Sequence, residues 1–146
     1  MMSQHEYNEW FKEMLSKHLT KYEYNLAAEN HEGTEYLTAT IPHPDDRKKD
    51  ILVSTYGREL TLFFWRHHEH HDSFEADDHE EEFVQLCEYI DDIISGKVFF
   101  AVAYRGDRVA YGNASYEFES LLDKEVDRVE IKSGAGERDQ IIKNMG

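Results

Sequence analysis

The chain of 146 residues carries 31 Asp and Glu against 16 Lys and Arg, which gives a formal net charge of −15 at pH 7. Its length predicts one domain, residues 1–146, and its 40% hydrophobic and 13% aromatic content excludes the class of acidic disordered chains. The charge argues against nucleic acid and against an anionic membrane as partners, because both repel an acidic protein.

Features of the sequence also indicate in which cellular compartment the protein resides. No apolar run approaches the roughly 20 residues that a membrane span needs, and the first residues lack the basic flank and apolar stretch of a signal peptide. The single cysteine, Cys87, cannot form an internal disulfide, which fits a reducing environment. We therefore expect a cytoplasmic protein.

The chain opens with a predicted amphipathic helix over residues 3–19. Apolar residues recur there at helical spacing: Tyr7, Trp10, Phe11, Met14, Leu15 and Leu19. Ser3 followed by Glu6 matches a capping box, in which each side chain accepts a hydrogen bond from the other residue's backbone N–H. The helix should pack its aromatic stripe against a sheet.

Two hairpins follow. Strands are expected over 22–29 and 34–41, and then over 50–56 and 59–66, with turn residues between the members of each pair. The last of these strands is apolar at successive positions: Leu60, Leu62 and Phe64 on one face, Phe63 and Trp65 on the other. Because the strand is apolar on both faces, we expect it to lie centrally in the sheet.

A second helix is predicted over residues 77–95, with Asp77 or Asp78 as its N-cap and Gly96 at its end. Its buried stripe is Phe83, Leu86, Cys87, Ile90, Ile93 and Ile94. Carboxylates in its first turn suit the helix dipole.

The last part of the chain reads mainly as strands. The apolar run 98–104 predicts an inner strand, and it turns back into a strand over 108–115. A short helix over 116–124, a strand over 126–132 and a glycine-containing tail follow. The expected fold is α+β: a mostly antiparallel sheet packed against the N-terminal helix and a central acidic helix.

The histidine-rich segment His67–Asp72 is the densest cluster of side chains that can do chemistry. If the preceding strand continues, His68, His70 and Asp72 share one face, while His67, Glu69 and His71 share the other. Alternate imidazoles on a strand can bind zinc or another transition metal. The chain lacks the His-Glu-x-x-His motif and has no cysteine at ligand spacing, and adjacent histidines also occur at solvated strand ends.

The segment 67–96 contains eleven acidic residues and no Lys or Arg, so it holds −11 of the net −15. Ordinary solvated helix faces mix both signs, because oppositely charged side chains three or four residues apart attract each other. A one-sided patch instead attracts and holds a cationic partner. A purely solvated acidic face remains the simpler alternative.

The central stretch resembles small bacterial immunity proteins of polymorphic toxin systems. The resemblance covers about residues 50–105 and lies in the order of features: the strand Leu60–Trp65, the histidine-rich segment, the acidic helix ending at Ile94, and the strand that begins at Lys97. It implies a cytoplasmic, non-catalytic protein that needs no cofactor and binds a cognate toxin domain, often over the toxin's active site.

We therefore predict a binding protein that neutralises a cationic toxin domain. A nuclease domain would be cationic in this way. The candidate partner-binding residues are Glu69, Asp72, Glu75, Asp77, Asp78, Glu81, Glu82, Glu88 and Asp92, with His68, His70 and His71 at the rim. The alternatives are a metal-binding module or metal-dependent enzyme that uses the cluster at 67–72, and a structural domain within an assembly. The sequence does not predict an oligomeric state.

Overall fold

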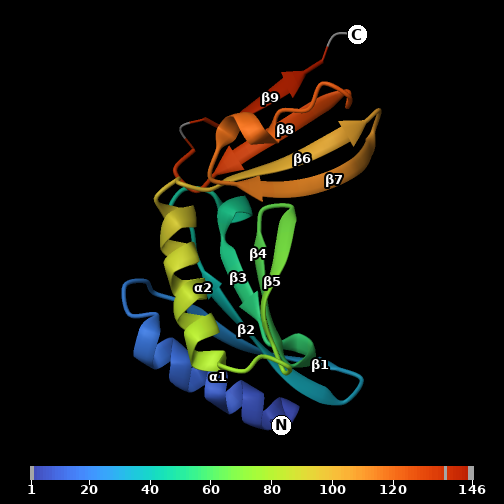
Figure 1. Ribbon diagram of the computed structural model, residues 1–146. Coiled ribbons are helices and arrows are strands. Elements are labelled where there is room, and N and C mark those ends of the chain that lie inside the picture. Colours follow the sequence, from blue (N-terminus) through green and yellow to red (C-terminus); the bar gives the residue numbers. More distant parts are fainter. Residues whose placement is uncertain (1, 137, 145–146) are drawn as a thin grey trace. The chain divides into compact units, whose positions relative to one another are not determined.

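The computed structural model describes residues 2–136 and 138–144. The fold is α+β, with an N-terminal and a central helix and two antiparallel sheets of five and four strands (Figure 1). The chain divides into two compact units, Met1–Glu88 and Tyr89–Gly146, each with its own sheet, and the division falls inside the second helix. The fold class is as predicted, although the strands belong to two sheets instead of one. The expectation of a single domain stays a prediction.

The first helix, α1 (Gln4–His18), begins as its sequence predicts. The Ser3 hydroxyl accepts a hydrogen bond from the Glu6 N–H at 3.1 Å, and the Glu6 carboxylate accepts one from the Ser3 N–H at 3.1 Å. This capping box satisfies two backbone donors that a helix otherwise leaves free. The predicted stripe is buried at Tyr7, Phe11, Met14, Leu15 and Leu19.

The sheet of the first unit has five antiparallel strands that neighbour each other in chain order. They are β1 (Asn25–His31), β2 (Thr34–Ile41), β3 (Ile51–Ser54), β4 (Glu59–Phe64) and β5 (His67–Ser73). Two short 3-10 turns, η1 (Arg47–Lys49) and η2 (Tyr56–Arg58), flank β3. We call the face that carries the buried aliphatic residues, such as Leu37 and Val53, the inner face, and the opposite face the outer face.

Strand β4 has the position in the sheet that its sequence predicts. It is internal, between β3 and β5, and its inner-face residues Leu60, Leu62 and Phe64 are buried. Phe63, however, is 40% exposed on the outer face, and Trp65 follows the strand in a left-handed conformation with φ of 54°. The strand is therefore internal in the sheet, while its outer face is exposed at Phe63.

The second helix, α2 (His79–Ile94), has its first turns in unit 1 and its last turns in unit 2. In unit 1, the ring of Phe83 meets the rings of Trp10 and Phe11 on α1 edge to face, at centroid distances of 5.9 and 6.0 Å. In unit 2, the helix ends at Ile94, and Gly96 just beyond it has the left-handed conformation predicted for it, with φ of 79°.

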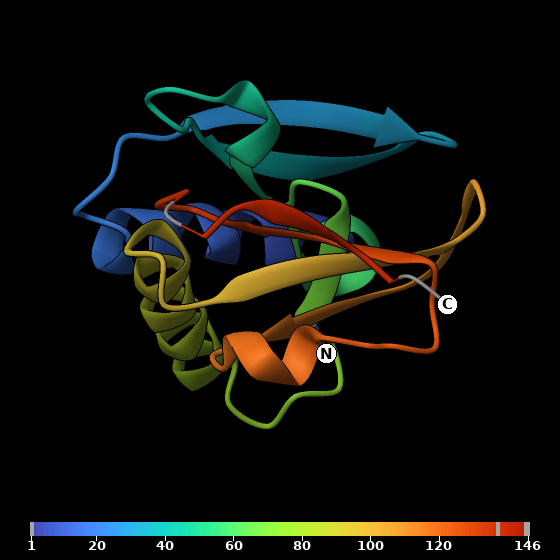
Figure 2. The same cartoon turned by 90° about the horizontal axis from the view of Figure 1, so that it is seen from above.

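The sheet of unit 2 has the strand order β7-β6-β8-β9, so β6 is an inner strand as predicted. The elements are β6 (Phe99–Arg105), β7 (Arg108–Ser115), η3 (Phe118–Leu121), β8 (Arg128–Ser133) and β9 (Gln140–Lys143). Phe118 and Leu121 of η3 pack against residues of β6 and β8, which places this turn against the sheet (Figure 2).

Two expectations for unit 2 are corrected. The helix expected over 116–124 is only the 3-10 turn η3, whose two buried residues, Phe118 and Leu121, are three positions apart, the repeat of a 3-10 helix. The expected glycine-containing tail includes strand β9, which pairs with β8. Gly134 lies so close to the end of α2 that a Cβ would overlap the Ile93 carbonyl, so this glycine is a packing residue.

No helix in the described part of the chain is long and apolar enough to cross a membrane.

Candidate partner-binding site

The histidine-rich segment forms β5, and a β-bulge divides it. Leu60 of β4 pairs with Asp72 and Thr61 pairs with His70, so His71 is an extra residue without a counterpart on β4. A bulge reverses the alternation of side chains, because one inserted residue shifts every later residue to the other face. Asp72 therefore lies on the inner face with Leu60, whereas His70 lies on the outer face.

This arrangement bears on the metal-binding alternative. His68 pairs with Phe63 of β4 and therefore lies on the outer face, as His70 does, whereas Asp72 lies on the inner face. The expectation that His68, His70 and Asp72 share one face is therefore wrong. Within residues 2–136 and 138–144, no group of three His, Cys, Asp or Glu side chains is placed to hold a metal ion.

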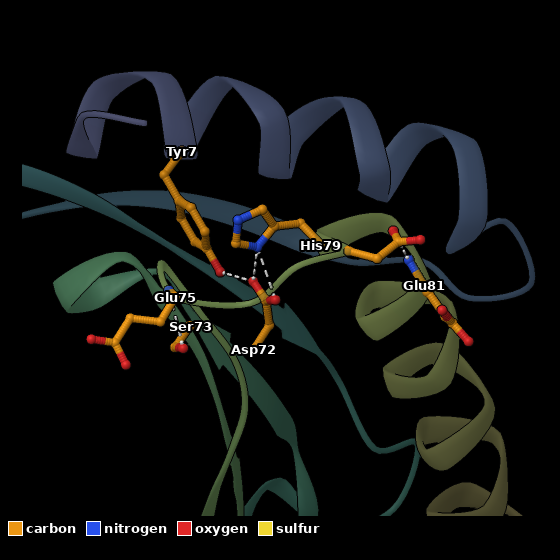
Figure 3. A network of polar contacts seen from close by, with 7 residues as sticks. Tyr7, Asp72, Ser73, Glu75, His79 and Glu81 are labelled. Atoms are coloured by element: carbon orange, nitrogen blue, oxygen red, sulfur yellow. Dashed lines mark hydrogen bonds and ion pairs between the residues drawn. The ribbon is translucent and has the colours of Figure 1, made fainter. Parts of the chain in front are cut away.

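Asp72 is the centre of a buried polar network (Figure 3). The Tyr7 hydroxyl donates to its Oδ2 at 2.5 Å, and Nδ1 of His79 lies 2.9 Å from both of its oxygens. The Asp72 side chain is fully buried, and burial, followed by this hydrogen bond, raises the pKa of Tyr7 well above its usual range. The network connects α1, β5 and the start of α2, so Asp72 is committed to the fold of unit 1.

A polar hollow of about 310 Å³ lies beside the bulge. It is lined by Glu59, His70, His71, Asp72, Ser73, Ala76 and Glu82. Nδ1 of His70 lies 2.8 Å from the Glu59 carboxylate, and burial lowers the pKa of His71. These contacts place His70, His71 and Glu82, all predicted as partner-binding residues, around one hollow.

The acids that face water lie between β5 and the middle of α2. Glu75, Asp77, Glu81 and Glu88 are exposed. We call these four residues the acidic segment. Among the described residues, no Lys or Arg forms an ion pair with any of them. Glu80 differs, since the Lys17 ammonium lies 2.6 Å from its carboxylate and lowers its pKa.

The remaining predicted residues have other environments. Asp78 is the N-cap of α2: its carboxylate accepts from the Glu81 N–H at 3.0 Å. Glu69 is on the inner face of β5, 3.3 Å from His67. Asp92, in unit 2, accepts a hydrogen bond from the Tyr116 hydroxyl at 2.8 Å. The structure therefore does not expose the predicted residues as one continuous surface.

A groove on the outer face of the first sheet is a feature that the sequence pattern did not indicate. Its volume is about 380 Å³, and it is lined by His31, Tyr36, Thr38, Leu52, Ser54, Tyr56 and Phe63. The available signal was the alternation along β2 and β3, which places Tyr36, Thr38 and Leu52 opposite the buried residues. The apolar residues on both faces of β4 indicated only a central strand, and a central position does not show whether the outer face is covered.

Comparison of the chain with protein-family models, with curated proteins and with solved structures yields no significant match in any of the three.

Proposed function

We propose that this protein is a non-catalytic binding protein of the immunity type, which neutralises a cognate toxin domain. The observation that supports the proposal is the acidic segment: four exposed carboxylates on one stretch of unit 1, without an ion pair to Lys or Arg among the described residues. Carboxylates that served only the fold would be expected to alternate with cations at helical spacing.

Helix electrostatics separate two groups of acids on α2. Glu80, Glu81 and Glu82 lie in the first turn, where the helix dipole stabilises negative charge. Glu88 lies in the second half of the helix, and the last turn contains no basic residue. Glu88 lies beyond the first turn, out of reach of the dipole that stabilises those three acids, and no Lys or Arg of the described chain forms an ion pair with it, so helix electrostatics do not account for Glu88. Contact with a cationic partner would account for it.

A toxin domain that cuts RNA or DNA must hold phosphates, and its surface is therefore basic. The acidic segment would increase the association rate by long-range attraction and would occupy the surface that binds the phosphates. Inhibition then requires no reaction by this chain, because the bound protein excludes the substrate. Association should slow steeply with added salt, since exposed charges are screened over about 8–10 Å at physiological ionic strength.

The test combines growth with binding. A toxin domain encoded beside this gene is expressed in bacteria with the wild-type protein or with the Glu75→Lys, Asp77→Lys, Glu88→Lys triple variant. The variant leaves Asp78 and Glu81 unchanged, because the Asp78 carboxylate caps α2 at the Glu81 N–H. It also leaves Asp92 unchanged, because Asp92 accepts the hydrogen bond from Tyr116. Wild type should restore growth, and the variant should lose at least about 1,000-fold in affinity, since like-charge juxtapositions cost several kcal/mol.

The matched control is Glu13→Lys, Asp45→Lys, Asp107→Lys, which changes the net charge equally at exposed positions outside the acidic segment. It should protect cells as wild type does. Equal protection by both triple variants would refute the role of the acidic segment, and failure of wild type to protect against any neighbouring toxin domain would refute the immunity function.

A further inference from the structure

The outer-face groove is built around three aromatic rings. Tyr56 lies between His31 and Tyr36, with centroid distances of 5.4 and 5.2 Å and nearly perpendicular ring planes. Tyr56 is 51% exposed and Phe63 is 40% exposed. Edge-to-face packing keeps the rings in place while their outward surfaces remain open to a ligand.

A second hollow, of about 290 Å³, continues from the same rings. It is lined by Gln4, His31, Glu32, Thr34, Tyr36, Tyr56 and Gly57. The two hollows share His31, Tyr36 and Tyr56, so they form the two ends of one surface depression. We call the combined depression the aromatic groove.

The hairpin that forms part of the aromatic groove carries charges of one sign. The hairpin of β1 and β2, residues 25–41, contains three Glu and no Lys or Arg. Glu29 is paired with Tyr36 in the sheet, which puts both on the same face, and Glu32 lines the second hollow. None of the described residues that line the two hollows is Lys or Arg. An anionic ligand would be repelled here, whereas a cation would be attracted by both the carboxylates and the ring faces.

The aromatic groove borders the acidic segment. Tyr56, on η2, lines the groove, and Arg58, on the same turn, places its guanidinium 4.5 Å from the centre of the Phe74 ring. Phe74 directly precedes Glu75, and Figure 1 shows η2 beside the chain that leads from β5 to α2. One extended cationic segment can therefore reach both features within unit 1.

We propose that the aromatic groove binds an arginine side chain of the cationic partner; this inference rests on the proposed function. Arginine fits better than lysine, because a planar, weakly hydrated guanidinium stacks on aromatic rings and a compact ammonium does so less well. Thr38 also lines the groove, and a threonine hydroxyl can accept hydrogen bonds from guanidinium N–H groups. The acidic segment then supplies attraction at long range, and the groove selects arginine at contact.

The test uses an acetylated oligoarginine peptide as the probe, with oligolysine of the same length as its comparison. The peptides are titrated into the isotope-labelled full chain, and backbone amide shifts are followed at low salt and at about 0.5 M salt, where screening confines charge effects to a few ångströms. At high salt, oligoarginine should still shift the amides of Tyr36, Leu52 and Phe63, and oligolysine should not.

Two groove variants and one control complete the test. Tyr56→Ala and Phe63→Ala should each weaken oligoarginine binding at high salt by about two- to fivefold, the range for a cation on an exposed ring. Tyr111→Ala, which removes a tyrosine that is 38% exposed in unit 2, should have no effect. Wild-type affinity in both groove variants, or shifts confined to amides of α2, would overturn the inference. Neither result would affect the growth test of the acidic segment, so the two proposals fail separately.

Discussion

Asp72 and Glu88 belong to the same acidic stretch of sequence, yet they occupy opposite environments. Asp72 is fully buried and bonded to Tyr7 and His79, whereas Glu88 faces water without an ion pair to Lys or Arg in the described chain. Asp72 is therefore part of the scaffold, and Glu88 is available to a partner. A concentration of charge in sequence thus combines residues that build the site with residues that act in it.

The contrast recurs between adjacent residues. Asp78 caps α2 through its carboxylate, while Asp77 is exposed beside it and makes no such bond among the described residues. Substitutions of a buried or capping acid, compared with substitutions of an exposed acid, therefore test whether the two kinds of acid have different roles.

The largest effect is expected for Asp72→Ala. Removal of this carboxylate leaves the buried Tyr7 hydroxyl without its acceptor, and the free energy of unfolding should fall by about 2–4 kcal/mol. Urea unfolding at neutral pH measures the loss. Asp77→Ala is the control, and it should change the free energy of unfolding by less than about 0.5 kcal/mol. Similar losses of unfolding free energy in both variants would contradict the distinction between acids that stabilise the fold and acids that are available to a partner.

A smaller effect is expected for Asp78→Ala. Loss of the N-cap leaves the Glu81 N–H without its side-chain acceptor, at a cost of about 1 kcal/mol. Asp78→Asn retains an acceptor oxygen and should recover most of the loss. Thermal unfolding of both variants tests this, and an Asn variant as unstable as the Ala variant would argue against capping.

A third effect is confined to acid pH. Burial lowers the pKa of His71 below its ordinary value of 6.5, so the unfolded chain takes up a proton at higher pH than the folded chain does. The contribution of the neutral His71 ring to the free energy of unfolding is fully present above pH 6.5 and is lost as pH falls through the lowered pKa. His71→Gln should remove this part of the acid sensitivity, as measured by urea unfolding between pH 7.5 and pH 5. An unchanged slope would contradict it.

The smallest effect is expected for Glu88→Gln. Neutralising an exposed carboxylate that has no ion pair to Lys or Arg among the described residues should change the free energy of unfolding by less than about 0.5 kcal/mol. Affinity for the cationic partner should nevertheless fall. A variant that loses stability would show that Glu88 serves the fold.

Local patterns in the sequence predicted much of the fold. The spacing of Ser3 and Glu6 predicted the start of α1, and Gly96 predicted the end of α2, because caps depend on residues close in sequence. The exposed acids of the candidate site were also named from the sequence. The second sheet, β9 and the open outer face were not, since they depend on which strands meet across the fold.

The identity of the buried acid could not be predicted for a related reason. Strict alternation along the histidine-rich segment assigns Asp72 to the face of His68, and only the register with β4 shows that His71 is inserted. The aromatic groove was missed likewise, because its residues come from β1, β2, β3, η2 and β4. Alternation along each strand shows which residues share a face, but not which residues of different strands lie side by side.

The bulge at His71 has a consequence for how this chain can change over time. The segment His67–Asp72 looks like a loosely specified polar run in which one residue more or less would hardly matter. The number of residues in this segment is instead constrained, because the inserted residue turns Asp72 toward Tyr7. Deleting a single histidine here would turn a carboxylate outward and leave a hydroxyl buried alone, so this run should tolerate substitution at exposed positions far better than any change in length.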